Sequence, residues 1–311
     1  SRFEKIVFAT MFKRIWAVFL GIFFCSLSVK SVAQELSNEG KTQLTQIEDS
    51  LVVVADSMYT AFLPDERPIH CERFVKQLIR ALKTPNSYAY QFPKLQKKIN
   101  IIGPADNSFR VFNWLVIGAD NHVRYYGAIQ MPSENLKLYP LVDYAKELGK
   151  FAEDSVLTGS KWFGALYYRI ISTEKDGKKL YNLFGLNSSG LVSNKKVIDP
   201  LQFSGDGIVF GAPIFNVSSQ NSNNRINRFV IEYKKEVQAS LNWDEELKMI
   251  YFDKLISQVN DPNRKYTYVP SGQYDGFRWE SNQWNYVQDL IPVQNFKDGE
   301  APAPKPVKGK E

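Results

Sequence analysis

The sequence predicts an α+β protein, in which an N-terminal helical pair packs on a large, mostly antiparallel β meander that closes partly into a barrel or sandwich. Apolar residues first recur at steps of three and four, as on one face of a helix, and from Phe109 they recur at every second position. The 311 residues are 44% hydrophobic and 14% aromatic, which suffices for a sizeable core rich in strands. Most expected strands are joined by short turns, as an antiparallel meander requires.

Residues 1–33 have the pattern of a leader with a cleavable signal peptide, and Met11 is the start that this pattern indicates. Lys13 and Arg14 precede an apolar run over 15–27, and Ser31-Val32-Ala33 places small residues where a signal peptidase cleaves. The leader predicts export to the periplasm or to the outer-membrane periphery, with no transmembrane span after cleavage. Two alternatives stay open, namely lipidation at Cys25 and retention of the apolar run as an anchor.

The segment 34–105 is expected to be an N-terminal helical region. One helix is predicted over 42–62, because its apolar residues follow helical spacing until Pro64 ends it. A second helix runs from about 69 to 83 and stops at Thr84-Pro85-Asn86. The connector that follows contains at most one more short helix, over 93–99.

The segment 106–296 is expected to be an antiparallel β domain. Its clearest hairpins turn at residues 119–121, at Asp176-Gly177 and at Ser281-Asn282, which are residue types that favour tight turns. A short helix is predicted over Pro140–Leu157, covering the sheet. Further strands are expected over 195–198, 208–210, 266–270, 276–280 and 283–287.

The stretch from Arg228 to Trp243 carries the strongest pattern, because apolar residues occupy nearly all its odd positions and polar residues nearly all its even ones. A period of two indicates a strand with one face toward a core and the other toward water. The sequence predicts one long, bent strand that turns at 244–246 and returns as 248–256.

Composition excludes several classes of function. Five of the 39 basic residues and one of the 33 acidic residues lie in the leader, which leaves 34 basic and 32 acidic residues, a charge of +2. Such a balanced chain lacks the charge pattern of a nucleic-acid-binding protein. No repeat of fixed length is present, which argues against a propeller or solenoid. Residues 297–311 form a Pro/Lys-rich tail that is expected to be disordered or an extended tether.

Residues with catalytic potential are few. His70 and His122 fall in different predicted elements, and Cys71 is expected to be a buried helical residue, so no metal site, cofactor or catalytic residue is predicted. Ser193 and Lys196 match a Ser-x-x-Lys motif, but their flanks are loop and strand and not the helix which that motif needs. The carboxylates of 244–246 are expected to cap a hairpin in solvent.

The most unusual local composition is an aromatic corner around a bend at Gly272. Its members are Tyr274, Asp275, Phe277, Trp279 and Trp284. Two interpretations stay open: the corner stabilises the fold, or it forms a recognition surface.

Two runs, Val237–Asp244 and Tyr274–Glu280, resemble uncharacterised exported proteins of Bacteroidota-type bacteria, and this resemblance extends over most of the mature chain. The resemblance implies export but no established activity. We therefore expect a periplasmic or outer-envelope protein without catalytic activity that binds or scaffolds an envelope protein or glycan. The alternative is an envelope glycan or polysaccharide hydrolase with paired carboxylates, which would need two converging acidic side chains in a cleft.

Overall fold

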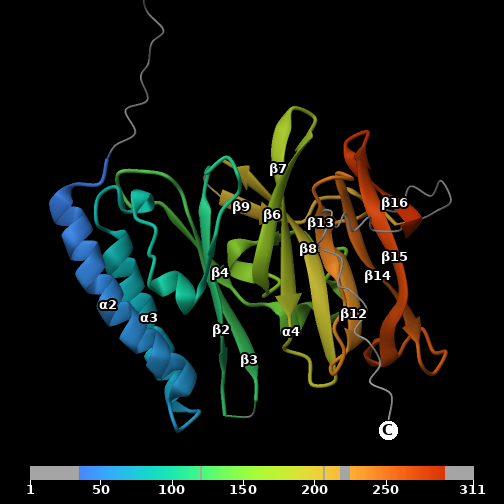
Figure 1. Cartoon of the computed structure of the whole chain (residues 1–311), viewed down its shortest axis with the longest axis horizontal. Coiled ribbons are helices and arrows are strands. Elements are labelled where there is room, and N and C mark those ends of the chain that lie inside the picture. Colours follow the sequence, from blue (N-terminus) through green and yellow to red (C-terminus); the bar gives the residue numbers. More distant parts are fainter. Residues whose placement is uncertain (1–34, 120, 206, 218–224, 291–311) are drawn as a thin grey trace, which may run out of the picture. The chain divides into compact units, whose positions relative to one another are not determined.

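The protein is an α+β structure whose chain begins with two packed helices. The computed structural model describes residues 35–119, 121–205, 207–217 and 225–290. Helices α2 (Asn38–Thr60) and α3 (Glu66–Leu82) lie side by side in Figure 1 and share a core with strand β2. The Ser37 hydroxyl accepts a hydrogen bond from the Gly40 amide and caps α2. Both predicted helices are confirmed, with starts three to four residues earlier than expected.

The helices cover the first of three mostly antiparallel sheets, one of which curls into a half-barrel. The β2–β3 hairpin is the one that the sequence predicts around 119–121. The first sheet has the order β1-β2-β3-β4, with strands β1 (Asn100–Ile102), β2 (Arg110–Ile117), β3 (Val123–Gln130) and β4 (Leu138–Val142).

The second sheet has the order β5-β9-β8-β7-β6, and strand β12 pairs with β8 beside it. Asp176 and Gly177 both have positive φ at the β6–β7 turn, as the predicted tight hairpin requires. The strands are β5 (Leu157–Thr158), β6 (Leu166–Lys175), β7 (Lys178–Asn187), β8 (Ser193–Ser204), β9 (Gly207–Phe210) and β12 (Phe229–Lys234).

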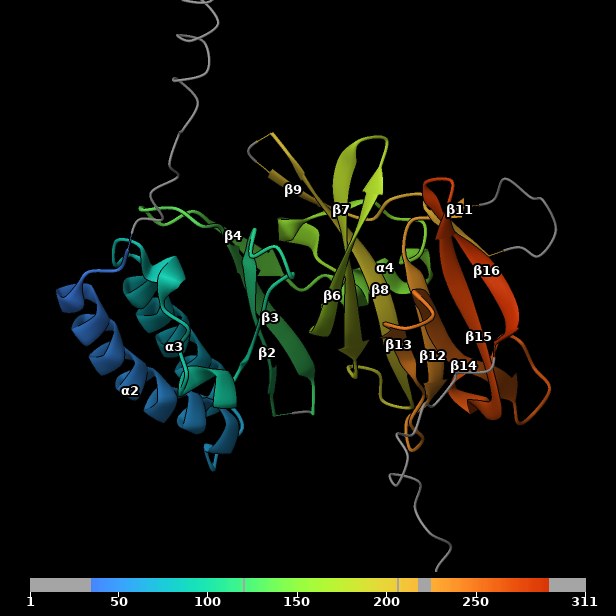
Figure 2. The same cartoon turned by 45° about the horizontal axis from the view of Figure 1, so that its top comes forward.

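The third sheet packs on the second through a shared aromatic core that includes Phe229, Phe252 and Phe277. Its order is β11-β10-β16-β15-β14-β13, and among these described strands only β10 and β16 pair in parallel. Figure 2 shows β14, β15 and β16 side by side. The strands are β10 (Phe215–Asn216), β11 (Arg225–Ile226), β13 (Leu241–Asp244), β14 (Met249–Ser257), β15 (Tyr268–Glu280) and β16 (Gln283–Leu290).

The prediction of one long strand from Arg228 to Trp243 is wrong. Strand β12 ends at Lys234, the chain turns over 235–240, and β13 begins at Leu241 in a different sheet. The amide of Lys235 still donates to Val192, and the amide of Val237 donates to Lys234 and closes the turn. The alternation persists across the break because both strands turn their odd-numbered side chains to the same core between the two sheets. The return strand after 244–246 is confirmed as β14.

The short helix predicted over Pro140–Leu157 is confirmed only in the middle of that range. Its first residues form the edge strand β4, in which Pro140 pairs with Ala128. Only the short helix α4 (Ala145–Leu148) and the 3-10 turn η3 (Gly149–Phe151) follow, and Gly149 ends α4 with φ of +51°. The apolar side chains Leu148 and Ala152 are nevertheless buried, in a core to which the first and second sheets both contribute, as the periodicity indicates.

The described residues from Leu36 to Leu290 belong to one compact unit. Among the described residues, no helix combines the length and the apolar content that crossing a bilayer requires. The predictions of a leader over 1–33 and of a tail over 297–311 lie outside the described residues.

Candidate functional site

The strongest candidate site lies along the free edge of strand β12. In the described chain β12 pairs with β8 alone, with Glu232 opposite Lys195. Because the amide of Lys235 continues this ladder to Val192, the odd-numbered residues of β12 exchange hydrogen bonds with β8. The peptide groups of Val230, Glu232 and Lys234 therefore point away from β8, toward the open edge.

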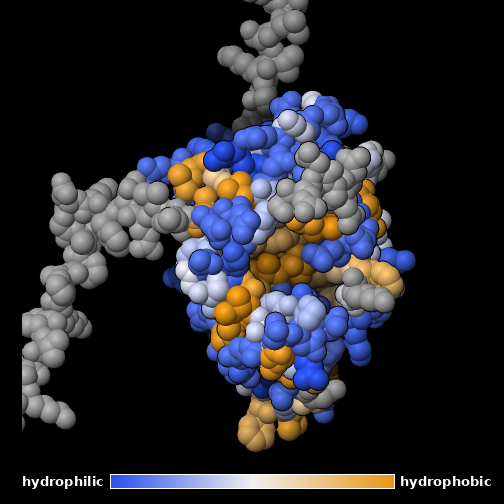
Figure 3. Space-filling view, turned by 90° about the vertical axis from the view of Figure 1, so that its right-hand side faces the viewer, coloured by the Kyte–Doolittle hydropathy of each residue, from blue (hydrophilic) through white to orange (hydrophobic). Residues whose placement is uncertain are grey.

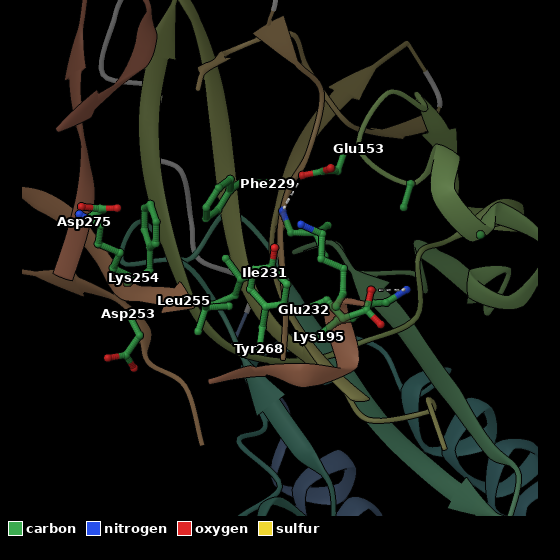
Figure 4. Close-up of a pocket in the computed structure, with 15 residues that line it drawn as sticks. Glu153, Lys195, Phe229, Ile231, Glu232, Asp253, Lys254, Leu255, Tyr268 and Asp275 are labelled. Atoms are coloured by element: carbon green, nitrogen blue, oxygen red, sulfur yellow. Dashed lines mark hydrogen bonds and ion pairs between the residues drawn. The ribbon is translucent and has the colours of Figure 1, made fainter. Parts of the chain in front are cut away.

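A cavity of about 680 Å³ opens beside this edge. Its apolar wall lies between the second and third sheets and consists of Phe229, Ile231, Phe252 and Leu255. Figure 4 shows Glu153 near one end of β12, and Glu232 beside Lys195 further along the strand.

A second cavity of about 500 Å³ adjoins the first and shares Gly149, Lys195 and Glu232 with it. It continues under the β7–β8 connection at Ser189–Leu191. We call the two cavities together the β12 groove.

Glu153 closes the groove at the start of β12. Its main-chain oxygen accepts hydrogen bonds from the amides of Asn227 and Arg228, at 2.8 and 3.1 Å. Its carboxylate Oε1 accepts the outward-pointing amide of Val230 at 3.3 Å, which is the place that a carbonyl of a further strand would take. Burial raises the pKa of the Glu153 carboxyl, and the charges of Lys265 and Lys195 act in the opposite direction.

Glu232 lies two residues further along β12 and belongs to a polar cluster. The Ser193 hydroxyl donates to Glu232 Oε1 at 2.5 Å, and Lys195 Nζ lies 3.8 Å from Oε2. Since Ser193 and Lys195 are alternate residues of β8, they share one face with Glu232, whereas Lys196 lies on the other face over the ring of Tyr168. The structure thus separates the Ser-x-x-Lys pair and replaces it with a Ser–Glu–Lys cluster.

A fully buried network holds the Glu153 segment against β12. Arg228 Nε donates to Asp199 Oδ1 at 2.7 Å, and both side chains are 0% exposed. The Tyr167 hydroxyl donates to the other oxygen of Asp199 at 2.9 Å. Arg228 Nη1 donates to the carbonyl of Ala152, immediately before Glu153. Within the described residues Nη2 has no hydrogen-bond partner, but the guanidinium lies over the ring of Phe163 at 5.5 Å.

The predicted aromatic corner forms the long β15–β16 hairpin. Asp275, Phe277 and Trp284 are buried, and the Asp275 carboxylate accepts hydrogen bonds from within the hairpin. Tyr274 and Trp279 are half-buried. The face to the right in Figure 1, where β15 and β16 lie, shows hydrophobic surface in a recess flanked by hydrophilic residues (Figure 3). The corner therefore contributes to the core, and its role in recognition stays a prediction.

The remaining candidates do not converge. Cys71 is buried, as expected, and accepts a weak hydrogen bond from Trp114 Nε1 at 3.4 Å. Asp244 Oδ1 accepts the amides of Glu246 and Leu247 and thereby caps the β13–β14 turn. Within the described ranges no three His, Cys, Asp or Glu side chains gather closely enough to hold a metal ion.

Sequence reasoning missed Glu153 and Glu232, whereas Asp275, a member of the predicted aromatic corner, also lines the larger cavity. Glu153 lies in the segment that was expected to be helical, and no local motif marks it. Glu232 was expected on a solvent-facing strand position, which gives no sign of the neighbouring cavity. Comparison of the chain with protein-family models, with curated proteins and with solved structures gave no match.

Proposed function

We propose that the chain is an exported, non-enzymatic protein of the cell envelope that binds a partner protein at the β12 groove. One observation carries the proposal: exposed apolar side chains rim the groove. Leu191 is 83% exposed and Phe151 is 61% exposed, and each lies on a segment that lines one of the two cavities. Large apolar side chains next to a cleft are typical of protein-binding surfaces.

The charges of the groove support binding of another polypeptide. Lys195 lies beside Glu232, and Lys254 forms an ion pair with Asp289 at 2.9 Å. Asp253 accepts the amide of Ser240 and its own amide donates back to the carbonyl of Ser240. Because these charged groups have local partners, apolar contact and backbone hydrogen bonding are the main interactions that the groove offers to a partner.

Localisation in the envelope rests on the leader pattern and on the resemblance to exported Bacteroidota-type proteins. Both come from the sequence. Fractionation of cells that express the full chain tests them, since we expect a processed product in the periplasm or at the outer membrane. An uncleaved cytoplasmic product contradicts this part of the proposal.

Hydrolysis of an envelope glycan is the second candidate, because Glu153 and Glu232 line one cavity. Glycosidases use one protonated and one ionised carboxyl group, and the raised pKa of Glu153 suits the acid. Glu232, however, already accepts the Ser193 hydroxyl and lies beside Lys195, which leaves it poorly placed to activate water. The hydrolase is supported if the wild type releases soluble sugar from purified envelope glycan and Glu153→Gln does not.

The binding proposal is tested by crosslinking in the native envelope. We expect Leu191→Asp to abolish recovery of the crosslinked partner, because it places a charge on the apolar rim. The matched control is Phe62→Asp, since Phe62 is 94% exposed on the connection between α2 and α3. Equal recovery from the wild type, Leu191→Asp and Phe62→Asp contradicts binding at the groove.

A further inference from the structure

The edge of β12 offers hydrogen-bonding groups that an added strand would use. The peptide groups of Val230 and Glu232 point away from β8, as the ladder requires. In the described part of the chain the amide of Glu232 has no hydrogen-bond partner, and the amide of Val230 donates only to the side chain of Glu153. An exposed edge of this kind is a template for an extended peptide.

The edge is closed at its Val230 end, and the 3-10 segment η5 (Lys265–Thr267) also lies close to β12. At the Val230 end, the main chain of Glu153 crosses the start of β12 and is bonded to Asn227 and Arg228. Arg228, which is fully buried, holds this crossing segment through the Ala152 carbonyl. A strand that pairs with β12 therefore cannot continue straight past Val230, so the pairing ends there.

A carboxylate already occupies the closed end. Glu153 Oε1 accepts the Val230 amide, and Lys195 and Lys265 are the cations whose charges favour its ionised form. Both lysines line the same cavity, and Lys265 lies over the ring of Tyr268 at 4.6 Å. The position thus combines a backbone donor with two cations, which is the complement of a peptide C-terminal carboxylate.

We propose that the groove binds the C-terminus of an extended polypeptide, which adds antiparallel to β12 and places its terminal carboxylate on the Val230 amide. The Glu153 carboxylate is the built-in substitute that this terminus displaces. This inference rests on the proposed function and names the part of the partner that is bound.

The register of the pairing fixes which ligand side chains enter the cavity. The C-terminal residue lies opposite Val230, and the residue two positions before it lies opposite Glu232, where it exchanges two hydrogen bonds. Residues opposite each other share a face, so both of these side chains lie on the face of Glu232 and Lys195. The penultimate residue and the one two before it lie on the other face, opposite Ile231 and Tyr233. The ligand is therefore apolar at these two positions and polar between them.

Fluorescence anisotropy with the full chain tests the proposal. The probe is the pentapeptide Ser-Val-Ser-Phe-Ala with an N-terminal fluorophore and a free carboxylate. Its controls are the C-terminal amide and the register-shifted isomer Val-Ser-Phe-Ser-Ala, which has the same composition. We expect the acid peptide to bind and both controls to bind at least about tenfold more weakly. The amide loses one charge-assisted hydrogen bond, and the register-shifted isomer loses apolar burial.

Variants separate this mode from other uses of the groove. Glu153→Ala removes the internal competitor, so it tightens binding of the acid. Lys265→Met weakens binding of the acid peptide but leaves binding of the amide peptide unchanged. The control Lys179→Met, on β7 beside Asp106, changes the binding of neither peptide. Glu232→Pro removes an outward amide that β8 does not use, and it abolishes binding in a chain whose circular dichroism is unchanged.

Equal binding of acid and amide, or a Glu153→Ala variant that binds no more tightly, overturns the proposal. Absence of peptide binding together with Leu191-dependent partner recovery overturns it as well and leaves the proposed function standing. Partner recovery that does not depend on Leu191 overturns both.

Discussion

Removal of the Arg228 side chain is the perturbation with the largest expected effect on the groove. Arg228 and Asp199 are both fully buried, so Arg228→Met leaves a buried carboxylate without its cation. Breaking a buried ion pair in this way costs about 3 to 5 kcal/mol. For a unit of this size, about 2 to 4 °C per kcal/mol predicts a fall in Tm of about 6 to 20 °C.

The loss should depend on pH. Burial raises the pKa of Asp199, and in the wild type Arg228 and the Tyr167 hydroxyl act against this shift. Without Arg228 the folded-state pKa of Asp199 rises further above its unfolded value. The variant therefore loses stability as pH rises from the unfolded pKa through the folded one, so the deficit relative to wild type is smaller in acid than at neutral pH.

Urea denaturation at several pH values measures the free energy of unfolding. The double variant Arg228→Met with Asp199→Asn removes both charges and keeps an acceptor for Tyr167, so we expect it to recover at least half of the loss. Hydrogen exchange at the amides of Asn227 and Arg228 should accelerate in the single variant, because Arg228 also fixes the Glu153 segment. A loss below about 1 kcal/mol, or a double variant no more stable than Arg228→Met, refutes this account of the pair.

Three further predictions address the groove and the core. Glu153→Gln should raise the free energy of unfolding relative to wild type at neutral pH, and it should have no such effect at a pH below the unfolded pKa of a Glu. The reason is that the raised pKa of Glu153 removes stability only as pH rises and the carboxyl ionises. Urea titrations at both pH values measure the difference. Trp284→Ala should cost about 3 to 5 kcal/mol because its ring is fully buried, whereas the half-buried Trp279→Ala should cost less than half as much and leave partner crosslinking intact. Asn113→Leu should cost about 2 kcal/mol or more in a thermal melt, because the Asn113 side chain bonds the amide of Tyr167 and the carbonyl of Ala165 across the first and second sheets.

Local patterns in the sequence were sufficient for the helices and for the tight hairpins. Helix α3 matches the helix predicted over about 69–83, and Cys71, Phe74 and Leu78 are buried along it. The turn at Ser281-Asn282 has positive φ at both residues, as its polar residue types indicate. These features depend on neighbours in sequence, which is why the sequence alone predicts them.

The segment 140–157 shows where local patterns fail. Its apolar spacing is compatible with a helix, but Pro140 pairs as an edge-strand residue and Gly149 breaks the chain direction. Burial of Leu148 and Ala152 is the part of the pattern that survives. The position of Glu153 over β12 depends on contacts with residues more than 70 positions away, and no local signal encodes such contacts.

The break in the 228–243 alternation explains both the wrong strand prediction and the presence of the groove. A single strand over 228–243 would have a neighbouring strand along each of its two edges. Instead the chain leaves the second sheet after Lys234 and joins the third sheet at Leu241, so no later strand of the described residues pairs with the outer edge of β12. The same change of sheet brings Phe229 and Phe252 into contact, with ring centroids 4.7 Å apart, in the apolar wall of the cavity beside that edge. An unpaired edge next to an apolar cavity is thus a direct consequence of how this segment is divided, and the Glu153 carboxylate satisfies one of its outward amides, that of Val230.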